Sequence, residues 1–402
     1  MSNRKLPTPR TVGFETGNYA FQHGADQSHG ISSALSGIGG RAVWAGNTRM
    51  DQPVLSSWIE NAPAGPVSGR GQRAPGTWRT HGSDVRTIGG RGTYGQPQFD
   101  QVVPPNGYLW WYIDAMSDDG QHGMTLIAFV GSVFSPYYAW ARRSGQADPE
   151  NHCALNVAIY SKGASRWAMT ERGRNSCSRD KNEFVIGPSY ITWDGDSLHI
   201  QINEISTPWL KNIQGEIRVW PEQMFNFSVP IDQQGSHRWG PLAPSARVEV
   251  NLTEPNLSWK GQAYLDSNEG DEPITEAFHV WNWSRAKMKD NSSLVFYDMT
   301  WPGQEDKLLS LRFTPQGQVE PLPAAPIQTM HKTAWQIGRR MRSDGPVELH
   351  EQLEDTPFYQ RALLNFSYAG EKLLAFHETL SVPRLLSPVV QAMLPFRMPR
   401  RA

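Results

Sequence analysis

Cysteine is almost absent from this chain. The 402 residues contain only Cys153 and Cys177, and these form no C-x-x-C pair. Disulfide frameworks and structural zinc sites both need more thiols at shorter spacings. We therefore expect neither a disulfide scaffold nor a metal site, and we expect a hydrophobic core to hold the fold together.

Long apolar runs are also missing. The longest, MTLIAFVGSVF at residues 124–134, is too short to span a bilayer as a helix. The first residues, MSNRKLPTPRTVGFETGNYAF, include basic side chains but no apolar core of a secretory signal. We therefore expect a cytoplasmic protein, either soluble or bound peripherally to a membrane.

Charge of either sign is scarce. Charged residues make up 19% of the chain, and the formal net charge is −1. Nucleic-acid binding needs a clustered basic surface, so we expect no nucleic-acid partner. Phosphate loops and the motifs G-x-S-x-G and H-E-x-x-H are missing as well. A functional site must therefore be built from scattered side chains.

Aromatic residues are abundant instead. The chain has 16 Trp, 12 Tyr and 15 Phe. Such residues favour strands and fill β-rich cores. They also line pockets for extended apolar ligands and stabilise cations. Both interpretations stay open at this point.

Strand periodicity begins near residue 105 and continues almost to the C-terminus. The segments 107–116 and 124–134 predict a hairpin, and the Asp-Gly step at 194–195 predicts another within 189–205. The length suits two or three domains. Short strands separated by turn clusters predict an all-β fold with two tandem domains, each a barrel or a sandwich.

The predicted organisation has four parts. An irregular Gly-, Ser- and Pro-rich leader covers residues 1–100, and a first β domain covers 101–235. A second β domain covers 236–380. The tail at 381–402 is basic and apolar, with its best helical pattern at residues 388–394. It fits either an anionic membrane surface or a frayed terminus.

Two short segments place titratable groups beside aromatic rings. His237 and Trp239 are two residues apart, as are Tyr264 and Asp266, so each pair shares one face of a strand. If both faces line one cavity, the site holds an acid, a base and two aromatic rings. These parts suit protonation of an unactivated alkene, because a buried Asp stays neutral and can donate a proton. Aromatic faces stabilise the resulting carbocation by about 2 kcal/mol each, and a histidine deprotonates the attacking water.

The same spacings have ordinary explanations. Asp266 opens the tripeptide Asp-Ser-Asn, which is typical of a turn. A same-face pair is also common where a core aromatic borders a satisfied polar side chain. Spacing alone leaves the catalytic and structural interpretations open.

Longer segments carry a family resemblance. The chain resembles the carotenoid 1,2-hydratases, also called hydroxyneurosporene synthases, over roughly residues 100–380. That family adds water across the terminal double bond of acyclic carotenoids such as neurosporene and lycopene, giving a tertiary alcohol without redox cofactor or metal. The segments that carry the resemblance are WWYIDAMSDDGQHGMTLIAFVGSVFSPYYAWAR at 110–142, SHRWGP at 236–241, GQAYLDSNEGDEPI at 261–274 and FHVWNWSRA at 278–286.

The resemblance implies roles for the two pairs. Asp266 is expected to be the proton donor, with His237, Trp239 and Tyr264 completing the site in a pair of lipocalin-like β domains. The expected partners are a long acyclic carotenoid, water and a membrane surface from which the insoluble substrate is loaded.

Two further aromatic side chains and two other functions stay open. Trp281 and Trp283 share a face and either extend the substrate tunnel or pack in the core. Tocopherol cyclases and some β-barrel Diels–Alderases are similar in architecture, so a proton-initiated prenyl cyclase or a pericyclic enzyme is one alternative function. A carotenoid carrier without activity is the other.

Overall fold

The computed structural model describes residues 96–301, 303 and 306–401. The predicted leader therefore lies outside the described residues, apart from residues 96–100. Strands dominate the described part, and the all-β prediction is confirmed.

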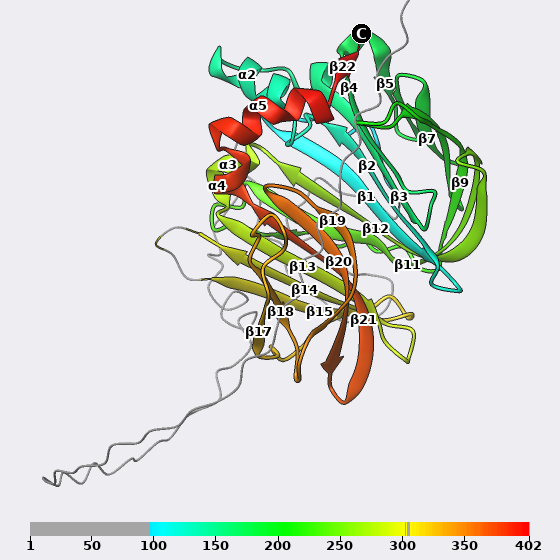
Figure 1. The fold of residues 1–402 in the computed structure, drawn as a ribbon, viewed down its shortest axis with the longest axis vertical. Helices are drawn as coiled ribbons and strands as arrows, with labels where there is room; N and C mark the ends of the chain where they lie inside the picture. Colours follow the sequence, from blue (N-terminus) through cyan, green and yellow to red (C-terminus); the bar gives the residue numbers. More distant parts are fainter. Residues whose placement is uncertain (1–95, 302, 304–305, 402) are drawn as a thin grey trace, which may run out of the picture. The chain divides into compact units, whose positions relative to one another are not determined.

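The larger sheet contains thirteen strands and curls along its length (Figure 1). Its strand order is β22-β4-β3-β2-β1-β12-β11-β9-β8-β7-β6-β5, with β10 paired to β11. The pairs are antiparallel, except that β22 runs parallel to β4. The strands are β1 Tyr108–Ser117, β2 His122–Val130, β3 Cys153–Ser161, β4 Arg166–Arg172, β5 Cys177–Arg179, β6 Glu183–Ile186, β7 Ser189–Trp193, β8 Leu198–Ile205, β9 Asn212–Pro221, β10 Val229–Pro230, β11 His237–Glu254, β12 Leu257–Gly270 and β22 Arg400–Arg401.

The smaller sheet has seven strands in the order β16-β15-β14-β13-β21-β20-β19. A separate hairpin, β17 with β18, follows β16 in the chain. The strands are β13 Val280–Lys287, β14 Ser293–Thr300, β15 Lys307–Phe313, β16 Val319–Pro321, β17 Ile327–Met330, β18 Arg339–Arg342, β19 Glu348–Asp355, β20 Tyr359–Tyr368 and β21 Glu371–Ser381.

The α-helices gather at one end of the two sheets (Figure 1). The longest, α5, begins at Pro388 and has Ser387 as its N-cap, whose hydroxyl accepts from the Val390 amide. The helix predicted at residues 388–394 is confirmed. The helical segments are α2 Pro136–Arg143, α3 Ile274–Ala277, α4 Val382–Leu385, α5 Pro388–Arg397 and the 3-10 turns η1 Pro149–His152 and η2 Arg174–Ser176.

Strand pairing bears on the predicted domain boundary at residues 235/236. Residues 237–270 form β11 and β12, and these strands pair with β9 and β1 of the larger sheet. The order of strands along the chain does not reveal which sheet a strand joins. Here β12 pairs with β1, although most of the predicted first domain lies between them in the sequence. We therefore propose that the second domain begins between β12 and β13.

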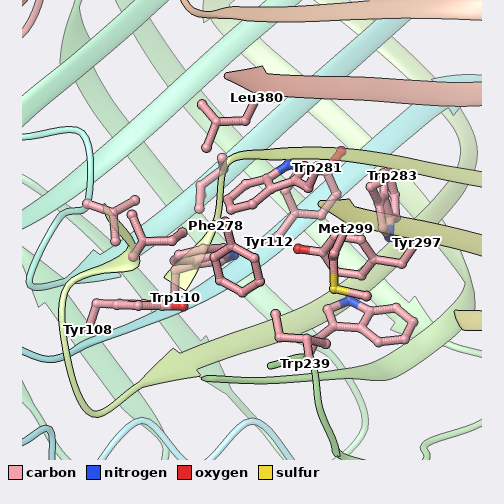
Figure 2. Close-up of a cluster of buried hydrophobic side chains, with 14 of the residues drawn as sticks. Tyr108, Trp110, Tyr112, Trp239, Phe278, Trp281, Trp283, Tyr297, Met299 and Leu380 are labelled. Atoms are coloured by element: carbon pink, nitrogen blue, oxygen red, sulfur yellow. The ribbon is translucent and has the colours of Figure 1, made fainter. Parts of the chain in front are cut away.

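An aromatic core lies between the two sheets. On β1, alternate side chains point to opposite faces, so Tyr108, Trp110 and Tyr112 enter this core while Leu109 and Trp111 pack within the curl of the larger sheet. Strands β11 and β12 add aromatic side chains from the same side, and β13 and β14 add others from the smaller sheet. The two sheets thus meet on a layer of rings (Figure 2).

Candidate active site

Asp266 lies in the middle of the larger sheet. It sits on β12 opposite Tyr112 of β1 and Pro241 of β11, and only 4% of it is exposed. Strand β12 continues to Gly270 and stays paired on both sides. The turn interpretation of Asp-Ser-Asn is therefore wrong, because the backbone beyond Asp266 remains extended and hydrogen bonded.

Two predicted site residues hold the carboxyl group of Asp266. The Trp239 indole Nε1 donates to Oδ2 at 2.8 Å, and the Tyr264 hydroxyl donates to the same oxygen at 2.9 Å. The other oxygen, Oδ1, is buried and has no hydrogen-bond partner among the described residues. A neutral carboxyl group that accepts two hydrogen bonds at Oδ2 carries its proton on Oδ1.

Burial keeps this acid protonated near neutral pH. Desolvation raises the pKa of Asp266 to about 8, against the lowering effect of the hydrogen bonds from Trp239 and Tyr264. The carboxylates of Glu378 and Asp114 raise the pKa further. At pH 7 Asp266 is therefore mostly a neutral carboxylic acid, and its proton lies on the oxygen that no described protein group binds.

His237 lies farther along the same sheet. Its Cα pairs with that of Gly270, four residues beyond Asp266 on β12. Its Nδ1 is 2.9 Å from the Tyr108 hydroxyl, and its Nε2 is 3.5 Å from Glu272 Oε1 without hydrogen-bond geometry. Desolvation lowers the pKa of His237, although the carboxylates of Asp232 and Glu272 oppose this. The imidazole is therefore neutral at pH 7.

Rings from the smaller sheet surround the acid. Trp283 lies 5.4 Å from Tyr264 and 5.5 Å from Tyr112, measured between ring centroids. Tyr297 connects Trp239 to Trp281, with centroid distances of 5.5 Å and 6.2 Å. Figure 2 shows Tyr112, Trp239, Trp281, Trp283 and Tyr297 in one cluster. The two residues that hold Asp266 are thus packed among further aromatic rings.

Sequence reasoning missed a buried charged network beside this cluster. The Tyr112 hydroxyl is 2.7 Å from Glu378 Oε1 and 3.0 Å from Asp114 Oδ2, and its single proton serves one of them at a time. Arg361 Nε donates to Glu378 at 2.8 Å, and Arg285 pairs with Asp114. The contacts of Tyr112 with Glu378 and of Arg285 with Asp114 connect the two sheets.

Only part of this network left a signal in the sequence. Tyr112 and Asp114 alternate with Trp110 on one strand face, which places them together. Glu378 and Arg361 lie on β21 and β20, far along the chain, and no local spacing connects them to β1.

A cavity of about 280 Å³ opens next to the cluster. Of the predicted site residues, Trp281 lines it, whereas Asp266, His237, Trp239, Tyr264 and Trp283 do not. Asp266 is thus not part of the wall of this cavity. The wall is formed in part by Trp110, Tyr112, Trp281, Glu378, Val390 and Leu394.

Metal ligands cannot be assigned. Within residues 96–401, leaving out 302 and 304–305, no three His, Cys, Asp or Glu side chains come together as a set able to hold a metal ion.

A solved structure supports the fold. The chain is similar to the crystal structure of an AttH from Nitrosomonas europaea, with a TM-score of 0.51 and 14% identity. The match covers 71% of this chain and 96% of that one. At this identity the likeness shows the fold alone, which confirms the lipocalin-like prediction.

Sequence comparisons show the family. The family model of the carotenoid hydratase CrtC matches residues 126–402. The acyclic carotenoid 1,2-hydratase of Rubrivivax gelatinosus is 50% identical over 382 residues, covering 94% of both chains. The enzyme of the same name from Thiocapsa roseopersicina is 47% identical and covers 92% of both chains. The chain therefore belongs to the carotenoid hydratase family, a family of hydro-lyases.

Proposed function

We propose that this protein adds water across the terminal C1–C2 double bond of acyclic carotenoids such as neurosporene and lycopene, giving a tertiary 1-hydroxy carotenoid. The observation that carries the proposal is Asp266, a carboxyl group that burial keeps neutral, held by an indole and a phenol inside an aromatic cluster. Membership of the carotenoid hydratase family supports the carotenoid substrate.

The first step is proton transfer from Asp266 to C2. The Oδ1–H bond breaks, and its electron pair stays on the carboxylate. The alkene π pair forms the new C2–H bond and leaves a tertiary cation at C1. Trp239 and Tyr264 stabilise the carboxylate that forms, because hydrogen bonds to charged groups contribute about 1.5–3 kcal/mol each.

The surrounding rings stabilise the cation. Trp239 and Tyr264 hydrogen bond to the acid through the edges of their rings, and the proposal places C1 of the substrate against the faces of these rings. A desolvated aromatic face contributes about 2 kcal/mol to a nearby cation. Two faces then lower the barrier by roughly 4 kcal/mol, or about a thousandfold in rate. Trp283, which contacts Tyr264, provides a third ring nearby.

His237 accepts the proton of the attacking water. In the tautomer whose Nδ1 donates to the Tyr108 oxygen, Nε2 keeps its lone pair, and Glu272 then stabilises the imidazolium. Gly270, the partner of His237, lies four residues along β12 from Asp266, which is about 13 Å. The proton therefore reaches the ring through bridging waters.

The reaction needs no redox cofactor under this proposal. Addition of water changes no net oxidation state, and a proton donor, a cation-stabilising pocket and a proton acceptor are sufficient. Returning the proton from His237 to Asp266 through water closes the cycle.

The substrate reaches the site from a membrane surface in this scheme. Acyclic carotenoids are insoluble in water, so loading from a bilayer avoids exposing the polyene. Within the described part of the chain, no helix combines the length and apolar character needed to span a membrane. We propose a peripheral association with the membrane.

Isotope labelling tests the function. The protein is incubated with detergent-solubilised lycopene in heavy-oxygen water without any added cofactor. The proposal predicts one labelled hydroxyl group per reacted end. Consumption of lycopene without a mass change indicates a cyclase instead, and recovery of bound but unchanged lycopene indicates a carrier.

A further inference from the structure

Helix α5 is apolar on two sides. Val390 and Leu394 are buried and line the cavity. On the other side, Val389 is 71% exposed, Phe396 is 84% exposed and Met393 is partly exposed. Their spacing of four and three residues places them on one face of the helix. An amphipathic surface helix would present charged side chains there, so this face requires another explanation.

A neighbouring loop extends the exposed apolar face. Trp209 and Leu210, between β8 and β9, are each 76% exposed. Two hydrogen bonds tie their loop to the end of α5: the Thr207 hydroxyl donates to the Arg397 carbonyl at 2.9 Å, and Arg397 Nη1 donates to the Thr207 carbonyl at 2.6 Å. The loop that carries these large side chains is therefore held beside the end of the helix.

A second loop carries the surface to the cavity. Arg384 of α4 donates to the Trp335 carbonyl at 2.7 Å, which holds that loop beside the helices. Trp335 and Met393 are partly exposed, and both line the cavity. The apolar surface thus reaches the mouth of the cavity. We define the apolar rim as Trp209, Leu210, Trp335, Val389, Met393 and Phe396.

The rim is flanked by positive charge. The segment 382–402 contains four Arg and no Asp or Glu. Arg401 is exposed at its end, and Lys211 follows Leu210 directly. Arg143 at the end of α2 and Lys332 near Trp335 are exposed as well. An apolar surface bordered by cations complements an anionic lipid surface, in which each basic side chain improves binding by about fivefold.

We propose that the apolar rim inserts into one leaflet of an anionic lipid bilayer, with the cavity mouth facing the acyl chains. Exposed apolar patches of this kind on a folded protein mark interaction sites. In this proposal, helices α2–α5, which gather at one end of the two sheets, belong to the docking end (Figure 1). The docking itself does not depend on the proposed function. Its purpose does, because docking would let a polyene pass from the leaflet to Asp266 without crossing water.

Vesicle flotation tests the docking surface. The full chain is floated with vesicles of phosphatidylcholine alone and of phosphatidylcholine mixed with phosphatidylglycerol. We expect binding to the mixed vesicles that weakens as salt is added. The double variant V389S/F396S is expected to bind about tenfold more weakly or worse, because two large apolar side chains no longer enter the leaflet. Neither residue lines the cavity.

A matched control removes exposed apolar side chains elsewhere. Ile327 on β17 and Leu349 on β19 are 41% and 48% exposed, and neither lines the cavity. The variant I327S/L349S is expected to bind vesicles like the unmodified chain. The variant R143Q/K211Q is expected to lose its preference for phosphatidylglycerol by about tenfold or more.

Two results would overturn the docking proposal. One is equal vesicle binding by V389S/F396S and the unmodified chain. The other is a dimer in lipid-free buffer that V389S/F396S converts to a monomer, since the rim would then be a contact between copies. A chain that binds vesicles but hydrates no lycopene refutes the proposed function alone. A chain that hydrates lycopene in detergent but does not bind vesicles refutes the docking alone.

Discussion

Replacement of Asp266 by Asn separates the chemistry of this site from its packing. The amide has nearly the same shape as the acid, and its oxygen can accept the hydrogen bonds that Trp239 and Tyr264 now donate to Oδ2. It cannot donate a proton to an alkene. General acid catalysis contributes about 10²–10⁴-fold to rate. We expect turnover to fall by about a thousandfold or more, while lycopene binding changes by about twofold at most.

The same variant should be more stable than the unmodified protein. Asp266 has a pKa of about 8 when folded and about 3.9 when unfolded. Between these values the folded state holds more protons, so the stability falls as pH rises from about 4 to 8. Between pH 4 and pH 7 the free energy of unfolding falls by about 1.4 kcal/mol per pH unit, or about 4 kcal/mol in all. The amide side chain of the D266N variant does not ionise, so the variant avoids this loss.

Urea unfolding and single-turnover assays give the two readouts. Unfolding midpoints measured from pH 5 to pH 8 should diverge, with the advantage of D266N growing as pH rises. Turnover of the unmodified enzyme should decline above about pH 8, where the acid ionises. Near-normal turnover by D266N would remove Asp266 as the proton donor. A stability difference that does not change with pH would mean that the carboxyl group is already ionised.

Three other substitutions test the neighbours of the acid. Tyr264→Phe removes a hydrogen bond that lowers the pKa of Asp266, so the alkaline limit of activity should move to higher pH while turnover falls about tenfold. His237→Ala should lower turnover by about a hundredfold without moving that limit, and full activity would show that the proton goes elsewhere. Trp281→Ala should raise the KM for lycopene more than it lowers kcat, because Trp281 lines the cavity; the reverse split would place Trp281 at the reacting atoms.

Local patterns predicted much of the fold. Alternation at 107–116 and 124–134 predicted a hairpin, which β1 and β2 form, and the Asp-Gly step at 194–195 joins β7 to β8. The helical apolar spacing at 388–394 predicted α5. The sheet that β11 and β12 join was not predictable, because pairing between strands distant in sequence leaves no periodic signal.

In the site, too, the spacing along one strand was predictable and the register between strands was not. Period-two spacing placed Tyr264 on the same face as Asp266, and the structure adds Trp239 from the neighbouring strand. The spacing placed His237 on the face of Trp239 too, but the register of β11 against β12 sets its distance from the acid, and bulges between Pro241 and Ala246 shift that register. Such irregularities depend on packing of the whole sheet. The catalytic roles of all four residues stay predictions.

The protonation state of Asp266 in the resting protein tests the central claim most directly. Infrared difference spectra between the unmodified protein and D266N, recorded across a pH titration, isolate the C=O stretching band of this single carboxyl group. The account predicts a protonated C=O band at pH 7 that disappears with a midpoint near pH 8. A carboxylate band already present at pH 6, with a midpoint near the ordinary value of about 4, would contradict it.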